Sequence, residues 1–371
     1  MLRQKKKRVL IWESLSDISG GQRVLLNILP FLRDNFLLSV IVPARGDMSM
    51  ELDKLGVKFI IIPNCRYNLI NKKTIDYIKY LFFAVINILI APFWFLKSDL
   101  IYINSTRILP FAYIASLISR KPIIWHVHSY VAGRVEQKII NHIAKSKLVK
   151  KIIVVSRALG EKIVAPANKV VVIYNGINLD RFCLCSKEPE RKIKFAIIGD
   201  IIPEKGHLVA IKALKKSLIN FDLYVVGKNR IGYQFYVQEL KKLITELNLD
   251  PVVHFLGERS DIERILCEVD CVLIPSIVFE SFSLVAIESM ASGRPVIGSD
   301  VGGIPEVIGL DSGYVFKLNN ENDLAQKIID LSQADINRRK LMQASARQRA
   351  VELFDVKVQG EKIGALIEQL L

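Results

Sequence analysis

Short apolar runs without polar alternation recur along the first half of the chain, and most are separated by stretches with apolar residues at helical spacing. Such runs are typical of strands that are buried on both faces of a parallel sheet. They lie at 9–12, 37–42, 57–62, 100–103, 122–125, 152–155 and 170–173. Strands that alternate with helices predict an α/β fold with a parallel sheet covered on both faces.

The second half of the chain repeats this pattern. Strands are predicted at 193–198, 221–226, 252–256, 271–274 and 295–297, with helices at about 206–217, 232–247, 260–267 and 282–291. A turn-rich segment at 175–182 separates the two series. We therefore expect two Rossmann-like doubly wound domains that face each other across a cleft. The first spans 1–177 and the second 178–354, and a last helix at 355–371 packs back on the first domain.

Residues 80–96 depart from this pattern, because they contain no charged residue and lysines flank them at both ends. Seventeen residues are at the short limit for a membrane span, and a span would place strands of one sheet on opposite sides of a bilayer. Two interpretations remain, a helix buried in the domain or a helix lying in the membrane interface. The second is slightly favoured by the charge of the surrounding half.

The net positive charge of the chain comes entirely from its first half. Residues 1–180 contain 27 basic and 11 acidic residues, a net charge of +16, whereas the whole chain carries +15. Such asymmetry indicates a polyanionic partner, either nucleic acid or an anionic membrane surface. Neither a helix-turn-helix, a zinc-binding spacing nor an aromatic stacking motif supports nucleic acid. The apolar run after the basic start is too short for a signal peptide, so we expect a cytoplasmic protein that is peripheral on the inner face of the plasma membrane.

The stretch 279–291 joins a predicted strand to a predicted helix and holds two carboxylates, Glu280 in the turn and Glu288 about two turns into the helix. Ser281 is the expected N-cap, which leaves the amides of Ser283 and Leu284 free at the helix start. A helix start suits a phosphate group. The pattern therefore fits a ligand with phosphate in its middle and hydroxyl-rich groups at both ends, such as a nucleotide-sugar.

Other candidate residues follow predicted strands, where open α/β sheets bind ligands. The Gly20-Gly21 pair lies between a strand and a helix and fits either a plain turn or a close backbone approach to a ligand. His126 and His128 are two apart on a strand, so both imidazoles face the same side; a metal site would need further ligands, and none is evident. Lys205 follows a glycine loop before a helix, a position suited to a phosphate.

Taken in order, these pieces resemble the family 4 glycosyltransferases of the GT-B fold. The resemblance runs nearly from end to end, and the two glutamates of 279–291 are its most specific element. The matching motifs are Gly20-Gly21, Ile103-Asn104-Ser105, His126-x-His128, Val155-Ser156, Asn175-Gly176, Gly199 with Lys205-Gly206, 279–291, Gly293-Arg294-Pro295-Val296 and Gly302-Gly303-Ile304-Pro305-Glu306.

The resemblance implies a retaining glycosyltransferase that moves a sugar from a nucleotide-diphosphate sugar to a lipid-linked or polysaccharide-precursor acceptor. It implies no cofactor and no metal. Glu280 and His128 would be the catalytic residues, and Asn104, Ser105 and His126 would lie on the acceptor side. The residues implied in donor binding are Gly20, Gly21, Lys205, Ser281, Phe282, Ser283, Leu284 and Glu288.

One position departs from the family pattern. Many members have an arginine after the glycine at position 199, whereas this chain has Asp200, so one diphosphate cation is missing. Arg157, Arg259 and Arg294 are candidates to replace it. Alternative hypotheses are a sugar-nucleotide epimerase or phosphorylase of the same fold, a basic binding protein without catalysis, and a scaffold that has lost activity.

Overall fold

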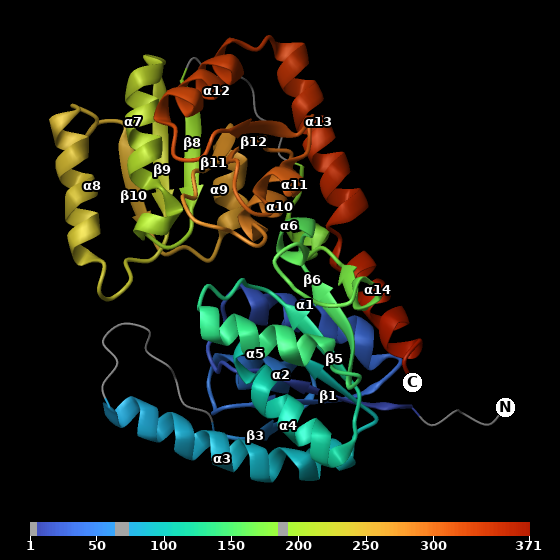
Figure 1. Ribbon diagram of the computed structural model, residues 1–371. Coiled ribbons are helices and arrows are strands. Elements are labelled where there is room, and N and C mark those ends of the chain that lie inside the picture. Colours follow the sequence, from blue (N-terminus) through green and yellow to red (C-terminus); the bar gives the residue numbers. More distant parts are fainter. Residues whose placement is uncertain (1–5, 64–73, 185–191) are drawn as a thin grey trace. The chain divides into compact units, whose positions relative to one another are not determined.

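The computed structural model describes residues 6–63, 74–184 and 192–371, and the side chains of 74–81 are not among the described ones. The chain forms two compact units, Met1–Gly176 with Val356–Leu371 and Ile177–Asp355. Each contains one sheet in which all the pairings are parallel (Figure 1). The placement of one domain against the other across a cleft stays a prediction.

The first unit has seven strands in the order β3-β2-β1-β4-β5-β6-β7. They are β1 (Arg8–Trp12), β2 (Leu37–Val42), β3 (Lys58–Ile61), β4 (Leu100–Ile103), β5 (Ile123–Val127), β6 (Val149–Val154) and β7 (Val170–Val172). Its helices are α1 (Gly20–Arg33), α2 (Asp47–Lys54), α3 (Thr74–Leu96), α4 (Leu109–Ser119), α5 (Arg134–Lys145), α6 (Arg157–Gly160) and α14 (Val356–Glu368). The strand order reverses between β1 and β4, so right-handed connections place α1 and α2 on one face and α3, α4 and α5 on the other.

The second unit has six strands in the order β10-β9-β8-β11-β12-β13. They are β8 (Ile193–Ile198), β9 (Phe221–Val226), β10 (Val253–Gly257), β11 (Cys271–Ile274), β12 (Val296–Ser299) and β13 (Gly313–Phe316). Its helices are α7 (His207–Ser217), α8 (Gln234–Glu246), α9 (Ile262–Glu268), α10 (Leu284–Ala291), α11 (Ile304–Ile308), α12 (Glu321–Gln333) and α13 (Ile336–Leu353). The strand β13 was not predicted, because its four residues include a glycine and a half-exposed tyrosine.

The core of the first unit lies between its sheet and the helices α1 and α14. The predicted apolar face of α1 is buried, with Val24, Leu25, Ile28, Leu29 and Leu32 all about 1% exposed or less. The helix α14 packs against α1 through Ile363 and Ile367, which are fully buried. The last helix is therefore part of the first unit's core.

The apolar segment 80–96 forms most of α3. One side of this helix is buried, as a core helix would be, and another side is exposed. On one side Ala91 and Phe95 are fully buried, and the side chain of Phe95 packs edge-on against Trp12 at 5.7 Å between ring centroids. On the other side Leu89 is 73% exposed. Simple burial is therefore wrong for the exposed side of this helix, as far as its side chains are described. Among the described residues, no helix meets the length and apolarity that a membrane span requires.

The contact between α14 and α1 generates a stability prediction. A Cβ atom added at Gly360 would lie 2.7 Å from Cβ of Phe31, whereas one added at Gly364 would meet only Leu32 at 3.8 Å. We expect Gly360→Ala to lower the free energy of unfolding by about 1–3 kcal/mol through overpacking. Gly364→Ala should raise it by up to about 1 kcal/mol, since alanine favours the helix. Chemical denaturation of both variants measures the difference, and equal effects would contradict this packing.

Candidate functional site

In the second unit, Lys205 and Glu280 form an ion pair. The Nζ atom of Lys205 lies 3.0 Å from Oε2 of Glu280, and Ser276 Oγ donates to the same oxygen at 2.5 Å. The side chains are 33% and 17% exposed, so the pair is partly shielded from water. Lys205 follows β8, whereas Ser276 and Glu280 follow β11, and these strands are neighbours in the sheet. The structure thus brings together two of the predicted site residues, 75 positions apart.

Two glycine loops hold the ion pair in place. Gly206 has a φ of +68°, and a Cβ atom there would lie 1.8 Å from the carbonyl oxygen of Pro275. Gly302 has a φ of +58°, and a Cβ atom there would lie 2.1 Å from the carbonyl oxygen of Glu280. The amide of Gly303 donates to that carbonyl oxygen at 2.8 Å. Both loops therefore approach so closely that a side chain would displace the segment carrying Glu280.

The helix after Glu280 begins two residues later than the sequence predicted. Ser283, not Ser281, is the N-cap of α10, and its Oγ accepts from the amide of Ala286 at 3.3 Å. Both serines suit a cap, so the sequence alone did not distinguish them. Phe282 packs edge-on against Phe354, at 5.8 Å between ring centroids. The free amides at the helix start are accordingly those of Leu284 and Val285.

A small pocket lies beside this helix start. Lys205, Ser276 and Ser283 line it together with residues of β8 and β11. Glu288 lies in the second turn of α10 and is only 7% exposed. Within the second unit, an ammonium group, two hydroxyls and a helix start therefore border one pocket. These are groups that favour an anionic ligand.

Asp200 forms an ion pair that the sequence did not suggest. Nε of Arg230 donates to Asp200 Oδ2 at 2.5 Å. The loops that carry the two residues run side by side, because Ile201 N donates to Lys228 O at 3.0 Å. An arginine thus lies beside position 200, although it comes from the loop after β9.

Two of the expected replacement cations are engaged elsewhere. Arg294 is 1% exposed, and its guanidinium donates to the carbonyl oxygens of Leu266 and Cys267 at the end of α9. Arg259 makes two hydrogen bonds to the carboxylate of Asp261, at 2.8 and 2.6 Å. Arg294 is therefore a buried structural residue, and Arg259 serves a local ion pair. Arg157 lies in the first unit, at the start of α6.

In the first unit, a buried carboxylate that the sequence analysis missed organises the candidate residues. Glu13 follows β1 directly and is 1% exposed. Its Oε1 accepts from the amides of Ser14 at 2.5 Å and Leu15 at 3.1 Å and from Gln22 Nε2 at 2.8 Å. Its Oε2 accepts from Asn104 Nδ2 at 2.7 Å. Burial raises the pKa of Glu13, and these hydrogen bonds oppose that rise. The sequence feature that could have indicated this role is an acidic residue directly after a buried strand.

The amide of Asn104 fixes the tautomer of His128. The Nδ2 group of Asn104 faces the carboxylate of Glu13 and the carbonyl oxygen of Gly21, at 2.7 and 3.3 Å. Both are acceptors, so Nδ2 must be on that side and Oδ1 faces His128 Nε2 at 2.9 Å. The hydrogen of the neutral imidazole is therefore on Nε2, and Nδ1 carries the lone pair. Burial lowers the pKa of His128 to about 4, and Nδ1 is buried without a hydrogen-bond partner among the described residues.

The remaining predicted residues of this unit lie around His128. A Cβ atom at Gly21 would lie 3.3 Å from the His128 ring, so the glycine lets the backbone approach this imidazole closely. The rings of His126 and His128 face the same side, as predicted, with centroids 4.0 Å apart. His126 Nδ1 lies 2.6 Å from the hydroxyl of Tyr102. Ser105 Oγ accepts a hydrogen bond from Ser14 Oγ at 2.8 Å and caps a short 3-10 helix, so its contacts are structural. Gly20 is the first residue of α1.

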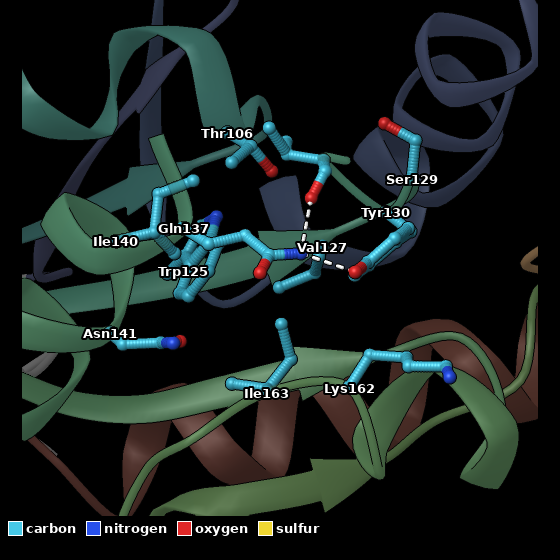
Figure 2. A pocket seen from close by; sticks show the side chains of 11 residues that line it. Thr106, Trp125, Val127, Ser129, Tyr130, Gln137, Ile140, Asn141, Lys162 and Ile163 are labelled. Carbon is cyan, nitrogen blue, oxygen red and sulfur yellow. Dashed lines mark hydrogen bonds between the residues drawn. The ribbon is translucent and has the colours of Figure 1, made fainter. Parts of the chain in front are cut away.

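A second small pocket lies on the other face of β5. Trp125 and Val127 line it (Figure 2). Along the chain they alternate with His126 and His128, so their side chains lie on the opposite face. Gln137 points into the same region and donates to the hydroxyl of Tyr130 and, at 2.8 Å, to Val131 O (Figure 2). This pocket is therefore separate from the histidine pair. In the part of the chain that the structure describes, no group of three or more potential metal ligands occurs.

Each of the two units matches a known glycosyltransferase family. Residues 18–181 match Glycosyltransferase Family 4, and residues 186–349 match Glycosyl transferases group 1. The chain belongs to these glycosyltransferase families. Its two sheets match GT-B structures: a glycosyltransferase from Rickettsia africae is 23% identical with a TM-score of 0.83 and 99% coverage of both chains. HepE from Anabaena, solved with UDP and glucose, is 23% identical with a TM-score of 0.82, covering 98% of this chain and 99% of its own.

Relatives with curated descriptions match over different lengths. An uncharacterised glycosyltransferase of Methanocaldococcus jannaschii is 31% identical over 44% of each chain. The colanic acid biosynthesis glycosyltransferase WcaL of Escherichia coli, a putative assignment, is 27% identical over 57% of this chain and 53% of its own. The chain thus spans about half the length of these relatives. A UDP-Gal:alpha-D-GlcNAc-diphosphoundecaprenol alpha-1,3-galactosyltransferase of Escherichia coli is 24% identical over 93% of this chain and 92% of its own.

The hydrogen-bond network of Glu13 generates a spectroscopic prediction. We expect the ¹⁵N resonances of His128 to show a neutral ring with its hydrogen on Nε2 from about pH 8 to about pH 5.5, because its pKa lies at about 4. Since the unfolded chain takes up this proton near pH 6.5 and the folded chain does not, this histidine also makes stability fall as the pH drops from about 6.5 to about 4.

In Glu13→Gln the new side chain can donate as well as accept, so the orientation of the Asn104 amide is no longer fixed. The ¹⁵N spectra should then show a mixture of His128 tautomers. Free histidine in the same buffer gives the reference shifts. An unaltered His128 spectrum in this variant would refute the role assigned to Glu13.

Proposed function

We propose that the protein is a retaining glycosyltransferase that moves a sugar from a nucleotide-diphosphate sugar to a lipid-linked or polysaccharide-precursor acceptor in surface-glycan synthesis. The observation that carries this proposal is the Lys205–Glu280 pair beside the start of α10, in the unit that matches Glycosyl transferases group 1. Structures of HepE with UDP and with UDP-glucose support a nucleotide-sugar donor. The Escherichia coli galactosyltransferase, whose name gives alpha-D-GlcNAc-diphosphoundecaprenol as its acceptor, supports the lipid-linked class.

The proposed donor site uses groups of the second unit. Lys205 and the free amides at the start of α10 take the diphosphate, whose negative charge grows as the bond between the anomeric carbon and the phosphate oxygen breaks. Ser281, Phe282, Ser283 and Leu284 form this turn and helix start, and Glu288 takes the ribose hydroxyls. Glu280, held by Lys205 and Ser276, contacts the transferred sugar near the reacting carbon. No metal ion and no cofactor takes part in this proposal.

The first unit contributes His128 and its neighbours. Because Nδ1 of His128 carries a lone pair, it accepts a hydrogen bond from a hydroxyl of the transferred sugar. Gly20 and Gly21 lie near the donor, and Asn104, Ser105 and His126 lie toward the acceptor. The acceptor hydroxyl attacks the anomeric carbon from the face that the phosphate leaves, and the departing phosphate oxygen takes the hydroxyl proton. The sugar thereby keeps its configuration.

With a lipid-linked acceptor, the reaction is proposed to take place at the inner face of the plasma membrane, where the protein is cytoplasmic and peripheral. An anionic membrane, rather than nucleic acid, is the proposed partner of the basic first half. A sugar-nucleotide epimerase of the same fold is the alternative function. Release of free nucleoside diphosphate only when acceptor is present distinguishes transfer from epimerisation.

Substitutions in the donor site test the proposed activity. We expect Lys205→Ala and Glu280→Gln each to lower transfer on the order of 100-fold, because each removes a group that acts where charge develops. The assay screens nucleotide-diphosphate sugars with membrane-extracted acceptors and identifies products by mass spectrometry. Lys216→Ala is the matched control, since Lys216 forms an exposed ion pair with Glu321 at 2.7 Å. Unchanged transfer in both site variants would exclude this site, and EDTA should leave the wild-type rate unaltered.

Arg230 is the proposed replacement for the arginine missing at position 200. We expect Arg230→Ala to raise the dissociation constant of a nucleoside diphosphate by roughly 5- to 10-fold, about 1–1.4 kcal/mol, while binding of the unphosphorylated nucleoside stays the same. Calorimetry measures both, with Arg259→Ala as the control, because Arg259 is also paired with an aspartate but follows β10, which is not a neighbour of β8 in the sheet. Equal affinities in the two variants would show that Arg230 does not contact the diphosphate. Complete absence of nucleotide binding in the wild type would favour a scaffold without activity.

A further inference from the structure

A continuous apolar surface covers the outer side of α3. Phe82, Val85, Leu89, Phe93 and Leu96 follow one another at intervals of three and four residues, so they lie on one face of the helix. All five are exposed, from 54% at Phe93 to 73% at Leu89. The stripe extends over about 21 Å at 1.5 Å per residue. Monomeric soluble proteins rarely expose an apolar surface of this length without a partner.

The neighbouring helix α4 enlarges this surface. It packs along α3 (Figure 1), and its outer positions Ile114, Leu117 and Ile118 are exposed as well. The polar side chains of α4 at Ser116 and Ser119 are buried instead. On α3, Asn87 is buried and its Nδ2 donates to the carbonyl oxygens of Pro63 and Phe83, at 3.0 and 2.6 Å. Asn87, Ser116 and Ser119 thus face inward, while the exposed apolar side chains named above face outward.

The charges next to this surface are mostly positive. Residues 97–121 contain the cations Lys97, Arg107, Arg120 and Lys121 and one carboxylate, Asp99, which pairs with Arg8 at 3.4 Å. Lys97 follows α3 directly, and its ammonium lies 3.8 Å from the centroid of the Phe93 ring. Arg120 and Lys121 follow α4. Helices with exposed apolar and aromatic side chains and with cationic residues at their ends are typical of segments that lie in a membrane interface.

We propose that this α3–α4 face, defined by Phe82, Val85, Leu89, Phe93 and Leu96 with Ile114, Leu117 and Ile118, inserts into the headgroup and upper acyl region of an anionic bilayer. The assignment rests on the proposed function, which places the acceptor at a membrane. A protein partner fits less well, because protein interfaces carry about one hydrogen bond per 100–200 Å² and these eight side chains offer none. The neighbouring cations complement anionic headgroups, at about 1 kcal/mol for each residue near the surface.

Vesicle flotation of the full chain tests this assignment. We expect binding to phosphatidylcholine vesicles that contain phosphatidylglycerol, weaker binding to pure phosphatidylcholine, and a decrease with salt. Leu89→Glu/Phe93→Glu should weaken binding at least 10-fold, since two charges would enter the apolar region. Leu117→Glu/Ile118→Glu should do the same from α4. The matched control is Phe235→Glu/Leu310→Glu, which changes a phenylalanine and a leucine exposed by 83% and 95% in the second unit.

Calorimetric nucleotide binding and thermal unfolding of each variant show whether the rest of the protein is intact. Wild-type protein that fails to bind anionic vesicles, or α3 and α4 variants that bind as the control does, would overturn the assignment. It would also be overturned if the wild type sediments as a dimer, the variants as monomers, and none of them binds vesicles. Nucleotide binding without vesicle binding contradicts only the membrane surface. Vesicle binding without nucleotide binding contradicts only the proposed transfer.

Discussion

Parallel pairing is the constraint on which both units depend. In a parallel sheet the carboxyl ends of all strands lie at one edge, so the residues that follow the strands come together whatever their separation in the sequence. Glu13, Asn104 and His128 follow β1, β4 and β5, which are adjacent in the sheet. The same holds for Lys205 and Ser276 in the second unit, after β8 and β11. Each group of polar side chains is thus brought together by the backbone hydrogen bonds between neighbouring strands.

The charged residues of the two groups differ in their exposure to solvent. Glu13 is enclosed, and a buried carboxylate is costly unless donors surround it, so backbone and side-chain N–H groups satisfy both oxygens. This arrangement leaves Asn104 one orientation and His128 one tautomer. In the second unit the Lys205–Glu280 pair keeps contact with solvent, so both charged groups remain accessible to a ligand. The first group is suited to fixing hydrogen positions and the second to rearranging around a ligand.

The sequence predicted the fold because periodicity and strand length are local properties. The strands at 37–42, 193–198 and 221–226 were predicted to the residue, whereas the order of the strands within each sheet was not predicted. The candidate site was partly predictable, since Lys205, Glu280 and His128 all follow recognisable strands.

The remaining details depended on contacts between distant segments. The choice of Ser283 over Ser281 as N-cap depends on where the turn after β11 ends, which packing decides. The pairing of Asp200 with Arg230 depends on two loops meeting after neighbouring strands. The engagement of Arg294 depends on the end of α9. The partners of Asp200 and Arg294 are not close in sequence, so residue spacing carries no signal for them.

The return of α14 to the first unit has a consequence for the order of folding during synthesis. Val356, Ile363 and Ile367 belong to the same core as β1 and α1, which the ribosome makes more than 300 residues earlier. The second unit, Ile177–Asp355, is synthesised entirely within that interval and contains all of its own strands. The domain made first therefore completes its core last. Until then the apolar side of α1 that receives α14 stays uncovered on the nascent chain, where a chaperone could bind it.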